Sequence, residues 1–286
     1  MSSELVRFVE RQDWLEPVEK TVQQAVETAV ERAGPVVANA LYGTWLGHPV
    51  HPVLTDIPLG AWTAAVVLDA LDSCDGGKGL KRGADAAVAL GLAGAVGSAI
   101  TGFTDWHKID GKQHRIGLVH GLLNTLGAGL FAASYICRRR SARESGRRLA
   151  VLGYAAAGIA AYLGGHLVYR EKIGVDHTPK ELPQDFTPVL DASELIEGEL
   201  KRADVGGVPV VLLKRSDQIF ALAETCSHLG GPLAEGQLED GDCVRCPWHG
   251  SLFSMQDGSV REGPATHPQP CLEARIHEGK VEVRGG

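Results

Sequence analysis

Three successive segments of 19 to 22 residues contain no Lys, Arg, Asp or Glu, and all lie within the first 169 of 286 residues. They cover residues 86–104, 116–137 and 149–169, and a weaker apolar stretch precedes them at 53–71. A helix of about 20 apolar residues is what a bilayer core of ~30 Å requires. The pattern therefore predicts four membrane-spanning helices. A soluble Ala-rich four-helix bundle is the alternative, but each of its helices would need a polar face, which these segments lack.

The residues before and after these segments have a different character. Residues 1–34 predict one amphipathic helix, because Val18, Val22, Val26 and Val30 recur at helical spacing until Gly34-Pro35 ends the pattern. The membrane domain is then expected over 35–169 and a polar, Pro-containing linker over 170–186. Residues 187–286 show short alternating runs separated by Gly-rich turns, which is typical of a small all-β domain. The expected class is thus α+β multidomain, and no internal repeat stands out.

Charge is unevenly distributed along the chain. Residues 170–286 carry 12 Lys and Arg against 20 Asp and Glu, a net charge of −8, whereas the whole chain has −7. Phosphate binding needs a basic face, so this acidic part argues against nucleic acid as a partner.

The strongest chemical signal is Cys226-Ser-His228 followed by Cys246-Pro-Trp-His249. Each pair offers one thiolate and one imidazole on a short turn rich in Gly and Pro, so both side chains can reach one point. A Cys₂His₂ set is compatible with structural zinc. The first pair, however, is C-x-H, tighter than a zinc knuckle, and no helix follows that would carry histidine ligands.

At these residues the sequence resembles the Rieske iron–sulfur family, whose signature is C-x-H followed by C-x-x-H. The spacer between the two pairs, 229–245, has the length typical of that family, and the flanking Leu-Gly-Gly-Pro-Leu and Pro-Trp-His-Gly stretches also resemble it. The resemblance implies a [2Fe–2S] cluster with Cys226 and Cys246 on one iron and His228 and His249 on the other. Imidazoles in place of two thiolates raise the reduction potential.

Several neighbouring positions refine this resemblance. Gly231 and Trp248 stand where cytochrome bc-type Rieske proteins have a disulfide, so that brace is absent, as in ferredoxin-type domains. Ser251 matches a serine whose hydroxyl donates to a cluster sulfur in the bc-type family, and Phe253 replaces that family's tyrosine. One of two potential-raising donors is thus expected to remain. Cys74, Cys137 and Cys271 are interpreted as packing residues. Cys243 forms a Cys-x-x-Cys with Cys246, for which redox chemistry is the alternative to the preferred interpretation, a strand residue beside the second pair.

The apolar part resembles an uncharacterised four-span bacterial membrane domain (domain of unknown function 2231). The resemblance lies in His48-Pro-Val-His51-Pro, in Asp56-Ile-Pro-Leu-Gly, and in Thr-Gly-Phe-Thr-Asp105-Trp. That family has no assigned chemistry, so the resemblance implies architecture and no function.

Four antiparallel spans would bring the histidines of this part to one membrane face, the one from which the Rieske-like domain continues. The residues concerned, with two nearby carboxylates, are His48, His51, Asp56, Asp105, His107, His114, His120 and His166. Intramembrane ionisable groups usually mark function, so a haem b, quinone or metal site is one hypothesis, with His120 and His166 as candidate axial ligands. The alternative is that these side chains cap helix ends and bond to lipid head groups.

Together these features predict a multi-pass membrane protein, of a bacterial cell membrane, that transfers single electrons to or from a redox partner protein or quinone. A membrane-anchored ferredoxin component of an oxygenase system and a redox sensor are the alternatives. Nine basic residues in the first and third connections, including Lys78 and six Arg of 138–148, compare with six near the other ends of the spans. The positive-inside rule then predicts that the Rieske-like domain is extracytoplasmic.

Overall fold

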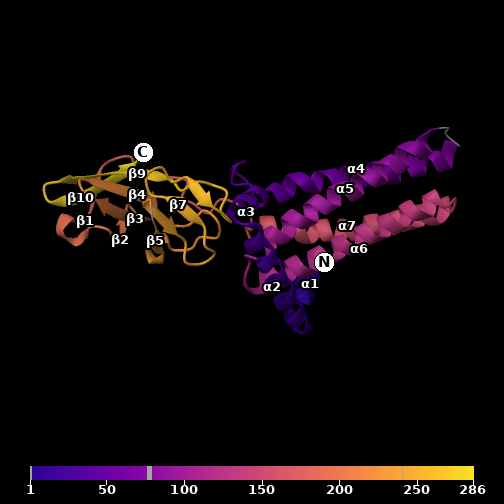
Figure 1. Ribbon diagram of the computed structural model, residues 1–286, viewed down its shortest axis with the longest axis horizontal. Helices are drawn as coiled ribbons and strands as arrows, with labels where there is room; N and C mark the ends of the chain where they lie inside the picture. The colour runs from indigo at the N-terminus through magenta and orange to yellow at the C-terminus, as the bar shows by residue number, and fades with distance from the viewer. Residues whose placement is uncertain (1, 76–78, 240) are drawn as a thin grey trace. The chain divides into compact units, whose positions relative to one another are not determined.

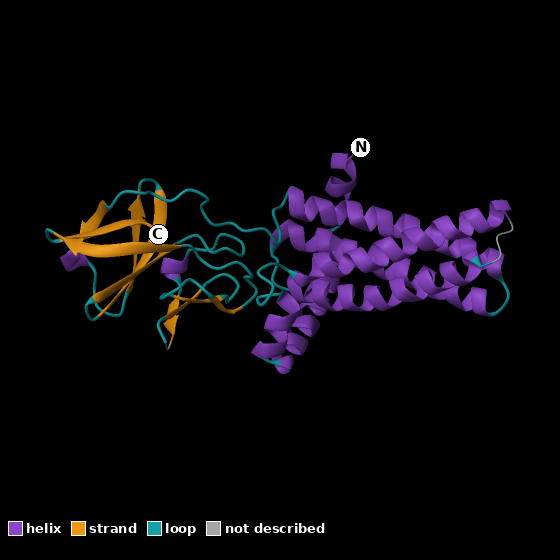
Figure 2. Ribbon diagram, turned by 90° about the horizontal axis from the view of Figure 1, so that it is seen from above, coloured by secondary structure: helices purple, strands orange, loops and turns teal. Residues whose placement is uncertain are grey.

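The computed structural model describes residues 2–75, 79–239 and 241–286. The chain divides into two compact units (Figures 1 and 2). The first contains the residues up to Gly34 together with Val50–Ile173, and the second contains Pro35–Pro49 together with Gly174–Gly286. The first is helical and the second contains the strands, which confirms the predicted α+β class. The division differs from the boundary expected at residue 35, because 35–49 groups with the C-terminal unit.

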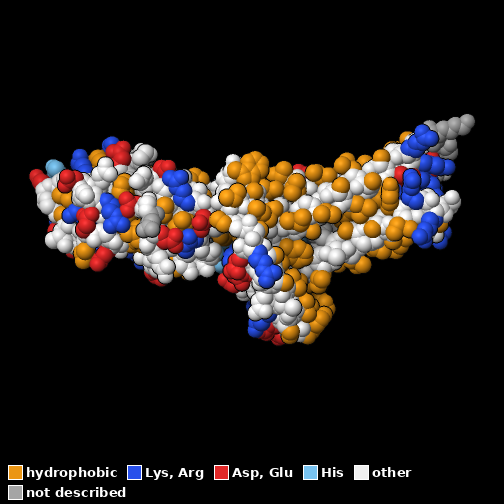
Figure 3. All heavy atoms as spheres, in the orientation of Figure 1, with side chains coloured by type: hydrophobic (Ala, Val, Ile, Leu, Met, Phe, Trp, Pro, Cys, Tyr) orange, Lys and Arg blue, Asp and Glu red, His pale blue; other side chains and the backbone are white. Residues whose placement is uncertain are grey.

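Four long helices form the first unit: α4 (Val50–Asp75), α5 (Leu80–Trp106), α6 (Gly111–Arg139) and α7 (Arg143–Tyr169). All four are long and apolar enough to cross a membrane. Large apolar side chains are exposed on their outer faces (Figure 3), among them Leu90, Val96, Ile100, Leu122, Leu126, Val151 and Leu152. A soluble bundle would carry polar side chains at such positions, so the outer surface favours the membrane interpretation.

Buried ion pairs join the helices at the end of the bundle where α4 connects to α5 and α6 connects to α7. Arg138 donates to Asp69 and, at 3.1 Å, to Asp85. Arg143 also reaches Asp85, at 3.0 Å, and Arg147 pairs with Asp72. Because each guanidinium has a carboxylate partner, these charges are compensated inside the bundle. Lys78 and the side chain of Cys74, both named in the sequence predictions, lie outside the described residues.

The two helical hairpins, α4–α5 and α6–α7, are an internal repeat that the sequence pattern did not reveal. Residues of α4 and α6 that differ by the same number of positions in the sequence contact each other. Trp62 stacks on Phe131 with ring centroids 4.2 Å apart, and Asp69 pairs with Arg138. Six buried positions of α5 have buried counterparts at a constant offset on α7, namely Ala84/Gly146, Val88/Ala150, Gly91/Gly153, Gly94/Ala156, Ser98/Ala160 and Thr101/Leu163. Equivalent residues that touch each other define a local two-fold axis between α4 and α6.

The N-terminal segment is two helices, so the prediction of a single helix is wrong. α1 (Ser2–Glu10) and α2 (Glu16–Ala33) are separated by a 3₁₀ turn, Asp13–Leu15. Pro17 lies in the first turn of α2, the one place where a helix tolerates its missing N–H. α1 packs Val6 and Val9 against buried apolar residues of α6 and α7.

The second unit contains two antiparallel sheets. The larger has the strand order β1 (Thr187–Asp191), β10 (Lys280–Gly285), β9 (Cys271–His277), β4 (Gln218–Ala223), β3 (Val208–Arg215), β2 (Leu200–Val205). The smaller has the order β5 (Gln237–Glu239), β6 (Cys243–Arg245), β7 (Leu252–Ser254), β8 (Val260–Glu262). This smaller sheet and the turns before it carry the cysteine–histidine pairs.

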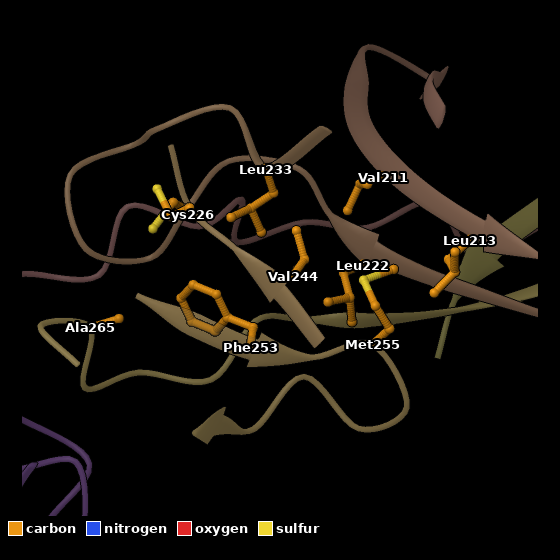
Figure 4. Close-up of a cluster of buried hydrophobic side chains, with 10 residues drawn as sticks. Val211, Leu213, Leu222, Cys226, Leu233, Val244, Phe253, Met255 and Ala265 are labelled. Carbon is orange, nitrogen blue, oxygen red and sulfur yellow. The ribbon is translucent and has the colours of Figure 1, made fainter. Parts of the chain in front are cut away.

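Strand β3 is buried on both faces and separates two hydrophobic cores. Val210 and Leu212 contribute to one core, and Val211 and Leu213 to the other. This division follows from the two-residue period of a strand. The second core, shown in Figure 4, also contains Cys226 of the first cysteine–histidine pair, so the turn that carries this pair is continuous with packed hydrophobic side chains.

Helix α3 (Pro35–Tyr42) is anchored to the second unit although all four long helices lie between it and β1 in the sequence. The side-chain amide of Asn39 donates to the carbonyl of Arg261 and accepts from the N–H of Gly263, both at 2.9 Å. The ring of Tyr42 is buried against Gly263, where a Cβ would lie 2.6 Å from Cδ2. Gly263 therefore has to be glycine for Tyr42 to pack there.

Candidate metal centre

The two cysteine–histidine turns share one backbone design. In the first, the N–H of Gly230 donates to the carbonyl of Cys226, and in the second that of Gly250 donates to the carbonyl of Cys246. Both glycines are left-handed, with φ of 81° and 79°, a conformation that side chains disfavour. Each cysteine N–H then donates to the residue five positions on, Gly231 or Ser251, at 2.9 and 2.8 Å. Two closed turns of the same shape thus present one thiol and one imidazole each.

The two thiols are buried and hydrogen-bonded to each other. The bond to Cys246, together with burial, raises the pKa of Cys226, whereas accepting that bond lowers the pKa of Cys246 to about 7. Each sulfur also accepts from the backbone N–H groups two and three positions further along the chain. These belong to His228 and Leu229 for Cys226, and to Trp248 and His249 for Cys246. Such N–H groups stabilise a thiolate, which is the form that binds metal.

The two imidazoles are half-buried and lie beside each other. The ring centroids of His228 and His249 are 5.0 Å apart, with the rings at 85°. Metal–nitrogen bonds of 2.0–2.1 Å place the centroids of two imidazoles on one tetrahedral ion roughly 5 Å apart. The donor set therefore fits one ion with two imidazoles beside two thiolates that hold another.

Glycine at position 231 allows the two turns to approach each other. A Cβ there would lie 2.8 Å from Sγ of Cys246 and 3.0 Å from the indole of Trp248. The indole itself is 57 % exposed, so Trp248 covers the turn from outside while Gly231 leaves room within. Neither position has a thiol, so no disulfide can join them, as the sequence indicated.

Ser251 is fully buried and its hydroxyl accepts from the N–H of Ala265 at 2.9 Å. This contact uses an oxygen lone pair and leaves the hydroxyl hydrogen available to donate. Phe253 is buried in the core of Figure 4. Cys243 is a buried free thiol on β6, consistent with a packing role.

Gln269, which lies just before β9, braces the first turn, and the sequence interpretation did not include it. Its side chain is buried, donates to the carbonyls of Ala223 and Thr225 at 2.8 and 3.0 Å, and accepts from the N–H of Ser227 at 2.8 Å. The Ser227 hydroxyl donates to the carbonyl of His267 at 2.7 Å. Nothing in the sequence pattern links these positions, because the four strands of the smaller sheet, β5 to β8, lie between the first turn and Gln269 in the chain.

Of the membrane-part residues singled out from the sequence, the structure brings His51 and His120 together, with ring centroids 6.4 Å apart. The others have separate surroundings. His107 is buried beside the carbonyl of Thr104, and His166 lies 3.2 Å from Glu171. Asp56 is exposed on α4 and Asp105 is half-buried on α5. His48 contacts the carbonyl of Pro49 and belongs to the second unit. His114 stacks on Trp106, with ring centroids 4.0 Å apart. His107, His114 and His166 thus do not join the His51–His120 pair.

Two protein families match this chain, one in each unit. Residues 185–273 match the Rieske [2Fe-2S] domain, and residues 47–177 match the family described as predicted membrane protein (DUF2231). Ferredoxin CarAc of Metapseudomonas resinovorans is 36% identical over 103 residues, 36% of this chain and 95% of that protein. The anthranilate 1,2-dioxygenase ferredoxin subunit of Burkholderia cepacia is 34% identical over 102 residues, 36% of this chain and 94% of that protein.

A third relative is longer. Apoptosis-inducing factor 3 of Homo sapiens is 32% identical over 121 residues, which are 42% of this chain and 20% of that protein. The paired thiol–imidazole turns thus define the class of iron–sulfur electron-transfer domains. The chain belongs to the Rieske [2Fe–2S] domain family, and its N-terminal part matches the DUF2231 family. Both resemblances stated from the sequence are thereby confirmed, and the Rieske domain implies a [2Fe–2S] cluster and electron transfer.

Proposed function

We propose that Cys226, His228, Cys246 and His249 hold the [2Fe–2S] cluster, and that the protein is a membrane-bound one-electron carrier. The observation that carries the proposal is the pairing of the two turns, which places thiol beside thiol and imidazole beside imidazole. The cluster supplies a one-electron couple when bound. The chain's own contribution is a buried thiol side, backbone N–H groups aimed at sulfur, and a half-exposed imidazole side through which electrons leave and enter.

The test uses the full chain purified in detergent, with iron, acid-labile sulfide and zinc measured per chain. Two irons and two sulfides are expected, with an electron paramagnetic resonance signal after reduction. Cys246→Ser should abolish the signal. Cys243→Ser is the matched control, because it removes a buried thiol on the strand that leads into the second turn and should leave the signal intact. Zinc in place of the two irons, or a cluster that survives Cys246→Ser, would refute the assignment.

A second candidate, an anchored ferredoxin component of an oxygenase system, is favoured by the names of the relatives that cover the Rieske domain. The two candidates differ in the partner, a membrane quinone or a soluble oxygenase-type protein. Stopped-flow mixing of the reduced protein with a short-chain quinone, and separately with an oxygenase component of a Rieske system, distinguishes them. Reoxidation by the quinone alone supports electron transfer within the membrane, and reoxidation by the oxygenase alone supports the ferredoxin role.

We also propose that the Rieske domain is extracytoplasmic, which follows from the excess of basic residues in the α4–α5 and α6–α7 connections. Figure 3 shows Lys and Arg gathered at that end of the bundle. A reporter enzyme that is active only in the cytoplasm, fused to the C-terminus, tests this orientation. Low reporter activity is expected, and high activity would reverse the proposed topology.

A further inference from the structure

His51 and His120 occupy equivalent positions of α4 and α6 in the internal repeat. Their ring centroids lie 6.4 Å apart and the planes of the two rings are at 86° to each other. The Trp62–Phe131 stack and the Asp69–Arg138 ion pair follow at the same spacing along both helices. The two imidazoles therefore face each other across the local two-fold axis of the bundle.

Both histidines are held in the same tautomer by the same kind of contact. Nδ1 of His51 lies 2.9 Å from the carbonyl oxygen of Ser98, and Nδ1 of His120 lies 2.7 Å from that of Ala160. A carbonyl oxygen only accepts, so each Nδ1 carries its hydrogen and each Nε2 presents a lone pair. A carbonyl partner for the other ring N–H is the usual support of a metal-ligating histidine.

Each ring also rests on a glycine one helical turn after the carbonyl that it contacts. A Cβ on Gly102 would lie 2.7 Å from Cε1 of His51, and a Cβ on Gly164 would lie 2.9 Å from Cε1 of His120. Carbonyl and glycine belong to the neighbouring helix, α5 or α7, so neither imidazole caps the end of its own helix. Both hairpins contain this histidine, carbonyl and glycine arrangement, although most of the surrounding residues differ between them.

The separation of the rings matches a shared metal. With metal–nitrogen bonds of 2.0–2.1 Å, two imidazoles on opposite sides of one ion have centroids roughly 6.4 Å apart. We propose that His51 and His120 together ligate one transition-metal ion through Nε2, present as the iron of a haem or as a bare ion such as copper or zinc. Imidazole suits all of these metals. The site is separate from the Rieske cluster and goes beyond the proposed function.

One polar neighbour has to move when the metal binds. The amide nitrogen of Asn124 lies 3.1 Å from Nε2 of His120 and 3.1 Å from the carbonyl oxygen of the same residue. The metal replaces the amide at Nε2, and the amide keeps the carbonyl as its partner. The equivalent residue of α4, Thr55, donates to the carbonyl of Pro52 at 2.7 Å instead of to His51.

The test uses the full chain, expressed with a haem precursor and trace metals and purified in detergent. Total metals, the pyridine haemochrome spectrum and the Rieske resonance signal are measured together. We expect one haem, or one equivalent of copper, zinc or nickel, beyond the two irons of the cluster. His51→Gln and His120→Gln keep a donor for the carbonyl and should each lower that metal at least tenfold while the Rieske signal persists.

His166→Gln is the matched control, because His166 is half-buried near the end of α7 and pairs with Glu171 instead. It should retain the metal. A pyridine haemochrome spectrum shows that the bound metal is the iron of a haem. One equivalent of copper, zinc or nickel without a haemochrome shows that it is a bare ion. A wild-type protein with neither, metal retained by both variants, or equal loss in the control would overturn the proposal. If the variants accumulate poorly, haemin or copper is titrated into the metal-depleted wild-type protein instead. The nuclear magnetic resonance signals of His51 and His120 should then change as the metal binds, and unchanged signals would overturn the proposal.

Discussion

Replacing Ser251 by alanine should lower the reduction potential of the cluster without removing it. The Ser251 hydroxyl is fully buried, accepts from the N–H of Ala265 and has its hydrogen free to donate. A bond to a cluster sulfur favours the reduced form, which is one electron more negative. Hydrogen bonds to charged groups are worth about 1 kcal/mol more than those between neutral groups. For a one-electron couple this difference corresponds to roughly 40 mV.

The same substitution also has a structural cost. The buried N–H of Ala265 loses its acceptor, and an unsatisfied buried donor costs about 1–3 kcal/mol. Potential and stability should therefore both fall, which makes a control necessary. Ser254→Ala removes another buried hydroxyl, on β7, that accepts from the N–H of Gln256 at 3.3 Å. It should reduce stability while the potential stays within the error of the measurement.

The assay is a redox titration of the full chain, followed by resonance or visible spectroscopy, beside urea unfolding of the same samples. A drop in potential confined to Ser251→Ala supports the hydroxyl–sulfur bond. An unchanged potential in Ser251→Ala would refute the reasoning, because the hydroxyl would then donate away from the cluster. Equal drops in both variants would assign the effect to loosening of the fold.

Three further predictions follow from the second unit. His249→Cys should lower the potential by on the order of 100 mV where the cluster is retained, since a thiolate adds negative charge, and the same redox titration measures it. Gln269→Ala removes three buried hydrogen bonds of the first turn and should lower the free energy of unfolding by about 2–3 kcal/mol in urea titration, whereas the exposed Gln256→Ala should not. Hydrogen bonds from the hydroxyl and N–H of Ser259 lower the pKa of Asp257 to about 2. The ionised Asp257 therefore stabilises the folded protein fully above the ordinary carboxyl pKa near 4, and this contribution is lost as the pH falls through 2. Asp257→Asn should therefore flatten stability against pH in that window, and an unchanged slope would contradict the assignment.

The two cysteine–histidine turns could be predicted from the sequence because the residues that form each turn are close together in the chain. Cys226 and His228, like Cys246 and His249, are near neighbours in the chain, and Gly230 and Gly250 close each turn within the same short stretch. The long apolar helices could also be predicted, because each appears in the sequence as a continuous run of apolar residues. Signals of this kind survive in a single sequence, since each is a property of a few adjacent residues.

What the sequence could not reveal depends on contacts between distant segments. Asn39 and Gly263 are hydrogen-bonded although they lie near opposite ends of the chain, so nothing near residue 39 indicates that α3 belongs with the strands. The role of Gln269 in bracing the first turn could not be predicted for the same reason, because its hydrogen-bond partners are more than 40 residues away in the chain. The internal repeat was missed because its two halves are alike in where they are buried and which residues they contact, and only a few positions, such as His51 and His120, are identical.

The Asp69–Arg138 pair has a consequence for the origin of the bundle. In a dimer of identical subunits, a residue that lies at the two-fold axis faces its own copy, so a dimer of one hairpin would bring Asp against Asp or Arg against Arg at this position. Joining both hairpins in a single gene product removes that restriction, because each half can then mutate alone. Opposite charges at the axis, with Asp69 on one side and Arg138 on the other, are a pairing that two identical hairpins cannot make. Like charges at this position would also disfavour assembly of either hairpin with a second copy of itself, so the pair favours association of the two different halves.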